Sequence, residues 1–135
     1  MEYLIGSILV LAVVGSATAI GLDCGREFYP TVLIVIASYY VLFAVMGASG
    51  RTLGLEVAVA FGFSSLAVLG FKKNLWLVAV AIAGHGVFDF VHHLLIDNPG
   101  PHWWPGFCLA FDGIAGAWLA LLLARRRRDR RTLVQ

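Results

Sequence analysis

The chain has 135 residues, 60% of them hydrophobic, and it carries ten basic and eight acidic residues. Only 13% of the residues are charged, about half the share that is usual in soluble domains. This composition excludes an ordinary water-soluble domain and favours a protein embedded in a membrane.

Apolar blocks follow one another along almost the whole chain. Each block holds about 20 residues, enough to cross a hydrocarbon core roughly 30 Å thick as a helix. Backbone hydrogen bonds must be satisfied internally in a bilayer, and the blocks are too long for barrel strands, so we predict helices. The predicted spans are residues 3–22, 29–48, 53–71, 75–96 and 104–124. We therefore expect an all-α integral membrane protein: residues 1–124 form one small bundle of five transmembrane helices, and residues 125–135 form a basic cytoplasmic tail.

The first block, residues 3–22, could be either a signal peptide or a membrane span. It ends in a small-residue pattern, Ala17-Thr18-Ala19, like that of a signal-peptide cleavage site. Its start carries Glu2 and no basic residue, whereas a signal peptide begins with positive charge. We interpret the block as a membrane span.

Basic residues predict the orientation of the bundle. The tail contains six arginines, and counting back through five spans puts Lys72, Lys73 and Arg26 on the same side, with only Arg51 opposite. Because basic residues concentrate in cytoplasmic segments, the N-terminus and the turn at residues 97–103 should lie outside. We expect a plasma membrane, specifically a bacterial inner membrane. The tail is interpreted as a topology anchor that attracts anionic lipid, not as a nucleic-acid surface.

Within the predicted span 75–96, four ionisable residues form a stripe. At about 100° per residue, His85, Asp89, His92 and His93 fall within an arc of roughly 100°. They belong to the outer half of the membrane, so their side chains should face the interior of the bundle.

Other spans supply matching carboxylates. Asp112 lies at the depth of Asp89, and the short turn between their spans predicts antiparallel neighbours whose two carboxylates approach each other. Glu56 should lie near the level of His92 and His93. Each such group costs about 2.5–3.5 kcal/mol at membrane depth. The carboxylates must therefore share protons, pair with a charged histidine or bind a cation.

Several further residues, in the spans and in the turn between the last two, are predicted to contribute to packing, to the membrane interface or to the site. Tyr39 and Tyr40 reach the same layer and are interpreted as packing residues, with contact to the site as the alternative. His102 is predicted as an anchor at the membrane interface, beside two tryptophans. Glycines should allow the last two spans to approach closely; these are Gly84, Gly86, Gly113 and Gly116.

The polar layer has the composition of a metal site. Side chains three or four residues apart on a helix can hold one ion, and imidazole with carboxylate suits zinc, or iron or manganese. The predicted ligands of a divalent metal, zinc or iron, are His85, Asp89, His92, His93 and Asp112. Glu56 or Asp112 is predicted as the general base. The alternative is that these side chains only join helices through hydrogen bonds.

Two families of membrane enzymes show partial likeness to this layer. The string His85-x3-Asp89-x2-His92-His93 resembles the histidine boxes of membrane desaturases and hydroxylases, which implies two irons. Those enzymes use more histidines than the four present here. Histidines and an aspartate on antiparallel spans are similar to the zinc sites of alkaline ceramidases and related membrane hydrolases, which implies zinc-dependent hydrolysis. That superfamily has more spans and a serine-bearing motif that has no match in this chain.

These observations predict a membrane-embedded metal-dependent enzyme that acts on a lipid-like or apolar substrate from the outer leaflet. Hydrolysis is the first expectation for its chemistry, and oxidation at a two-iron site is the second. The alternatives are a metal-free His/Asp acid–base isomerase, a proton or ion carrier, and an accessory subunit of a larger membrane complex. We expect membrane lipid and a lipid-like small molecule as partners, no nucleic acid, and either a homo-oligomer or a larger complex.

Overall fold

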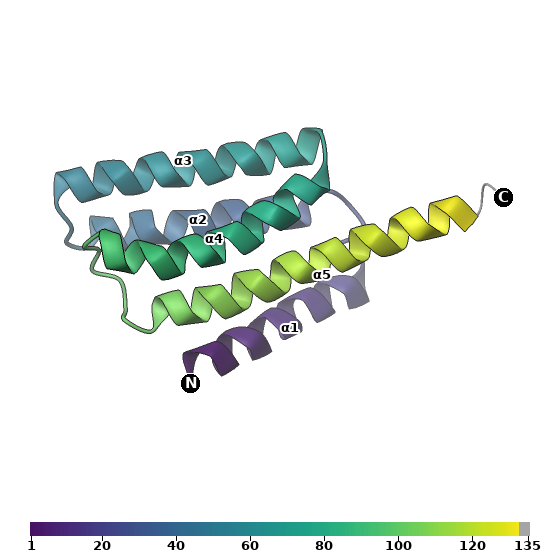
Figure 1. Cartoon of the computed structure of the whole chain (residues 1–135), viewed down its shortest axis with the longest axis horizontal. Helices are drawn as coiled ribbons and strands as arrows, with labels where there is room; N and C mark the ends of the chain where they lie inside the picture. The colour runs from purple at the N-terminus through teal and green to yellow at the C-terminus, as the bar shows by residue number, and fades with distance from the viewer. Residues whose placement is uncertain (133–135) are drawn as a thin grey trace.

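A computed structural model describes residues 1–132 and shows an all-helical chain (Figure 1). Its five helices are α1 (Glu2–Ile20), α2 (Phe28–Val45), α3 (Gly50–Lys72), α4 (Leu75–Leu95) and α5 (Trp104–Thr132). Each is long and apolar enough to cross a membrane, as the apolar blocks predict. Residues 133–135 and the side chain of His93 lie outside the described part, so neither the end of the predicted tail nor the predicted His93 ligand is placed.

The basic segment is helical as far as the structure describes it. Helix α5 continues without a break from the apolar block to Thr132, and its end projects beyond the other helices (Figure 1). Arginine is a strong helix former, and no glycine or proline interrupts residues 125–132, so nothing ends the helix at the last apolar residue. The segment is a helical extension of the bundle.

Local signals in the sequence explain where the helices begin and end. Gly21 ends α1 with φ 79°, and its N–H donates to the carbonyls of the last turn. The left-handed conformation favours glycine at such a position. Ser49 caps α3 by accepting a hydrogen bond from the Thr52 N–H at 3.1 Å. Asn74 caps α4 through the Trp76 N–H at 3.0 Å.

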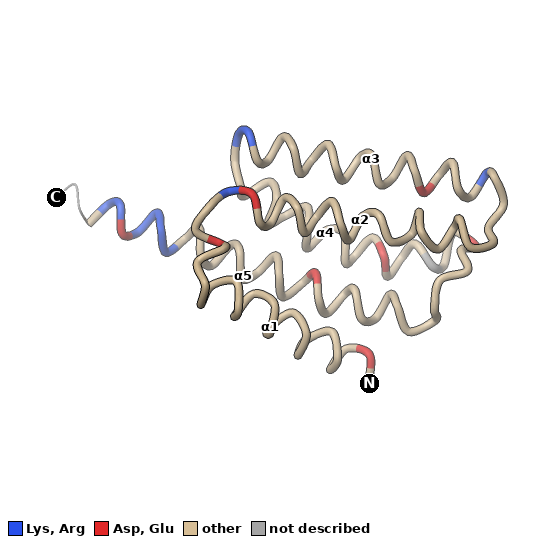
Figure 2. Tube along the Cα trace, turned by 180° about the vertical axis from the view of Figure 1, so that it is seen from behind, with Lys and Arg blue, Asp and Glu red and all other residues tan. Residues whose placement is uncertain are grey.

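Successive helices run in alternating directions, so the bundle has two distinct ends. Figure 2 shows basic residues gathered at one end of the bundle, here called the basic end. Nine of the ten basic residues belong to the α1–α2 turn, the end of α3 and the extension of α5, whereas Arg51 belongs to the start of α3. The opposite end, called the histidine end, holds the start of α1, α3 and α5 and the close of α2 and α4.

Packing places α4 and α5 at the centre of the arrangement. Helix α5 lies between α1 and α4, and α3 lies between α2 and α4. A Cβ added at Gly86 would come within 2.9 Å of the Asp112 Cβ, and one at Gly116 within 2.8 Å of the Ala79 carbonyl oxygen. These two glycines therefore permit the close approach of α4 and α5 that the sequence predicts.

The expectation for the other two glycines is wrong. An added Cβ would meet no neighbouring atom within 4 Å at Gly84 or Gly113, because both residues face away from the α4–α5 contact. Close packing occurs instead at Gly6 and Gly106, between α1 and α5.

Candidate metal centre

Helix α4 directs its polar stripe into the bundle. His85, Asp89 and His92 are 1%, 0% and 1% exposed. Their spacing of four and three residues keeps them on one helical face, and that face meets α3 and α5. Because three ionisable side chains of α4 are buried on this face, they need polar partners from α3 and α5.

Helix α5 supplies the partner of His85 and Asp89. Nδ1 of His85 lies 2.9 Å from Oδ2 of Asp112 and 3.5 Å from Oδ2 of Asp89. One donor atom from each residue lies within 4.8 Å of the others, so the three side chains can hold a metal ion. This group is called the His–Asp–Asp cluster. The predicted approach of Asp89 and Asp112 across the α4–α5 contact is confirmed.

Two separations within the cluster, both from His85, match those of ligands that share one ion. Donor atoms about 2.0–2.2 Å from a metal are about 2.9 Å apart at a right angle and about 3.4 Å apart at a tetrahedral angle. The two contacts of Nδ1 of His85, 2.9 Å and 3.5 Å, fall at these values. The two separations from His85 are therefore compatible with a shared ion.

The cluster also has unused acceptor atoms and unbalanced charge. Both oxygens of Asp89 and Oδ1 of Asp112 are buried without a hydrogen-bond partner. Two ionised carboxylates beside one imidazole leave net negative charge even when the imidazole carries its second proton. Burying such charge is costly, so the cluster needs either a cation or additional protons.

Apolar and weakly polar groups surround the cluster. The ring of Phe63 from α3 meets His85 edge-on, with ring centroids 4.7 Å apart. Phe88 lies beside Phe63 at 5.7 Å. The buried thiol of Cys108 lies next to Asp89 and Asp112. Such walls lower the local dielectric and strengthen charge interactions inside them.

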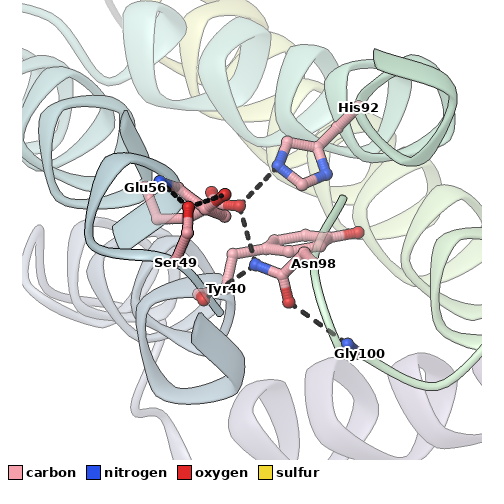
Figure 3. A network of polar contacts seen from close by, with 7 residues as sticks. Tyr40, Ser49, Glu56, His92, Asn98 and Gly100 are labelled. Carbon is pink, nitrogen blue, oxygen red and sulfur yellow. Dashed lines mark hydrogen bonds and ion pairs between the residues drawn. The ribbon is translucent and has the colours of Figure 1, made fainter. Parts of the chain in front are cut away.

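His92 takes part in a second contact (Figure 3), and it lies three residues after Asp89 on α4, toward the histidine end. Its Nε2 lies 2.8 Å from Oε1 of Glu56, and both side chains are fully buried. Asn98, in the turn between α4 and α5, donates to the same oxygen at 2.7 Å and to the Tyr40 carbonyl at 3.2 Å. The ring of Tyr40 lies against His92, with centroids 4.2 Å apart. This His92–Glu56 pair joins α2, α3, α4 and the turn.

The structure thus divides the predicted ligands. It brings His85, Asp89 and Asp112 together, and it pairs His92 with Glu56 outside the three-residue group. His93 lies outside the described side chains. His102 is exposed in the turn, away from the His–Asp–Asp cluster.

Sequence reasoning missed two contributors to these contacts. Asn98 belongs to an Asp-Asn-Pro-Gly turn, a composition that indicates only a change of direction. Phe63 could have been found, because it lies seven residues after Glu56 and so on the same face of α3.

Two cavities adjoin the polar layer. One, of about 380 Å³, lies under the α4–α5 turn and is called the loop pocket; its lining includes Tyr40, His92, Asp97, Asn98, His102 and Trp104. The other, of about 490 Å³, is lined by α1, α2 and α5 and is called the apolar groove; its lining includes Leu9, Val13, Val32, Ile36, Trp104, Phe107, Cys108, Phe111 and Asp112. Asp112 therefore belongs both to the cluster and to the apolar groove.

No protein-family description, curated protein or solved structure matches the chain.

Proposed function

We propose that the chain is an integral membrane enzyme that holds one divalent metal ion at His85, Asp89 and Asp112 and hydrolyses a lipid-like substrate. The observation that carries this proposal is the convergence of three buried donor groups whose ligand atoms lie within 4.8 Å of one another. Imidazole and carboxylate ligands suit zinc, iron and manganese. We take zinc as the first choice of metal, with iron or manganese as alternatives. A bound metal would polarise a carbonyl group and acidify a bound water.

The number of donors supports a single ion. A catalytic zinc site uses three protein ligands and leaves one position for water or substrate, which is the number of side chains in the cluster. Two-iron sites in helical bundles draw on six ligating side chains. Among the described residues, three converge, so hydrolysis is favoured over oxidation at a two-iron centre.

The apolar groove supports a substrate with a hydrocarbon chain. Its lining is aliphatic and aromatic apart from Thr31, Cys108 and Asp112. Asp112 reaches this lining, and its Oδ1 has no hydrogen-bond partner. We assign proton abstraction to Oδ1 of Asp112 in preference to Glu56, because Oε1 of Glu56 is already held by His92 and Asn98.

The proposed membrane orientation rests on the two ends of the bundle. Basic residues gather at the end of α5, which we place in the cytoplasm of a plasma membrane such as a bacterial inner membrane. The histidine end, with the loop pocket, then faces outward, and the cluster is reached from the outer leaflet.

Metal content tests the proposal. Wild-type protein purified without chelator should carry about one equivalent of zinc, iron or manganese, since a catalytic ion is held by three side chains. Asp89→Ala should lose most of it, because it removes two buried acceptor atoms that have no hydrogen-bond partner. His102→Ala is the control and should keep its metal, since His102 is exposed in the turn. Equal metal in wild type and Asp89→Ala would place the ion elsewhere.

A metal-free acid–base isomerase is the second candidate. The direct contact of 2.9 Å between Nδ1 of His85 and Oδ2 of Asp112 favours it, because such a pair can transfer a proton without an ion. Metal-free wild-type protein that remains folded would support this candidate against the hydrolase.

A further inference from the structure

We propose that the loop pocket receives the polar head of an amphipathic lipid whose chain lies in the apolar groove, the head being recognised through its hydrogen-bond-acceptor oxygens. This inference rests on the proposed function and deepens it by naming the class of substrate. It concerns Tyr40, Trp104 and His92, none of which belongs to the His–Asp–Asp cluster.

Unpartnered polar atoms in the loop pocket indicate a ligand. Tyr40 and His92 line the loop pocket and are only 6% and 1% exposed. The Tyr40 hydroxyl, which also faces Asp89 and Cys108, and Nδ1 of His92 are buried without a hydrogen-bond partner. Leaving such groups unsatisfied destabilises the fold. An acceptor oxygen of a ligand headgroup would satisfy the Tyr40 hydroxyl.

The character of these groups selects an acceptor. A phenol O–H donates, and the indole N–H of Trp104, which also has no partner, can only donate. His92 is held by Glu56 through Nε2, so its Nδ1 is the ring nitrogen left to face a ligand. A carboxylate, ester or phosphate oxygen matches the two donors of Tyr40 and Trp104, whereas a quaternary ammonium offers no acceptor.

Trp104 connects the head and chain sites. It is the residue of α5 that lines both the loop pocket and the apolar groove. A molecule that passes Trp104 would have its head at His92 and its chain beside Asp112. His92 lies three residues beyond Asp89, about 4.5 Å along the helix axis. The bond between head and chain would therefore lie within one helical turn of the cluster.

The test compares two probes with the same chain and opposite heads. Decanoate or decyltrimethylammonium is added to the purified protein in nanodiscs, with histidines labelled with ¹⁵N and the His92 signals assigned by substitution. Decanoate should shift the His92 signals in a saturable way, and decyltrimethylammonium should not. Equal shifts, or no shift with either probe, would overturn the headgroup site. Decyl phosphate in a third arm distinguishes a general acceptor site, which should bind both anions, from one restricted to carboxylates.

A pair of tyrosine variants identifies the donor. Tyr40→Phe removes only the hydroxyl and should weaken decanoate binding about tenfold, the effect of losing one hydrogen bond to a charged group. Tyr29→Phe is the matched control: Tyr29 is 3% exposed and also has an unpartnered hydroxyl, but it lies at the basic end, so binding should not change. Equal binding by Tyr40→Phe and wild type would remove Tyr40 from the site.

Metal analysis of the same samples separates the two proposals. Metal-loaded wild type that shows no preference for decanoate would contradict the headgroup site and leave the metal centre intact. Metal-free wild type that still prefers decanoate would contradict the metal centre and support the headgroup site.

Discussion

Asp89 and Asn98 differ in whether their polar atoms have hydrogen-bond partners. Asp89 is completely buried and accepts no hydrogen bond of its own, whereas Asn98 spends both N–H groups of its amide on Glu56 and the Tyr40 carbonyl. An unsatisfied buried carboxylate destabilises a fold unless a ligand binds to it, and a satisfied amide stabilises the fold directly. We therefore assign Asp89 to function and Asn98 to structure.

Replacing Asn98 should loosen the α4–α5 turn. Asn98→Ala removes a hydrogen bond to a charged group and one to a backbone carbonyl, and we expect a loss of about 1–3 kcal/mol of stability. Thermal unfolding in detergent and hydrogen exchange of residues 96–103 measure the effect. Asp97→Ala, at the exposed neighbouring position, is the control. Unchanged exchange in Asn98→Ala would show that the turn is held by other contacts.

At the scale of helices, the site depends on how closely α4 approaches α5. Gly86 lies directly over Asp112 and the Cys108 carbonyl, one residue after His85. A side chain there would separate the two helices at the cluster itself. Stability and metal binding should therefore respond together to a substitution at Gly86.

Gly86→Ala should lower stability by about 1–3 kcal/mol, the usual cost of overpacking, and should weaken metal binding. Gly84→Ala is a matched control two residues earlier on the same helix, where an added Cβ meets nothing within 4 Å. Thermal unfolding and metal content are measured on both variants. Equal behaviour of the two would contradict the close approach of α4 and α5 at Gly86.

The five helices can be predicted from the sequence. The division of the polar layer into the His–Asp–Asp cluster and the His92–Glu56 pair cannot. Apolar length predicts the five helices, and the short turn predicts that Asp89 meets Asp112. The rotation of α3 about its axis is set by its packing against α2 and α4, and this rotation pairs Glu56 with His92. No periodicity in α3 reveals it, because the helix has an apolar residue on nearly every face. The contact of Asn98 depends on the path of a turn, which proline and glycine allow but do not determine.

For the whole molecule, the charge asymmetry between the two ends predicts a fixed orientation in the membrane. The two native cysteines make this testable, since Cys24 is exposed near the basic end and Cys108 is buried. In intact cells, a membrane-impermeant maleimide should leave wild type unlabelled and should label Asp97→Cys in a Cys24→Ser background. Permeabilised cells should expose Cys24. Labelling of wild-type Cys24 from outside would reverse the orientation.

X-ray absorption spectroscopy of the metal in purified protein tests the central claim most directly, namely that His85, Asp89 and Asp112 hold one ion. We predict a first shell of oxygen and nitrogen at about 2.0–2.2 Å with a single imidazole, no sulfur at about 2.3 Å, and no second metal at about 3.5–4 Å. The shell should disappear in Asp89→Ala. A metal-free wild-type protein, a sulfur shell from Cys108, or a second metal would contradict the single-ion cluster.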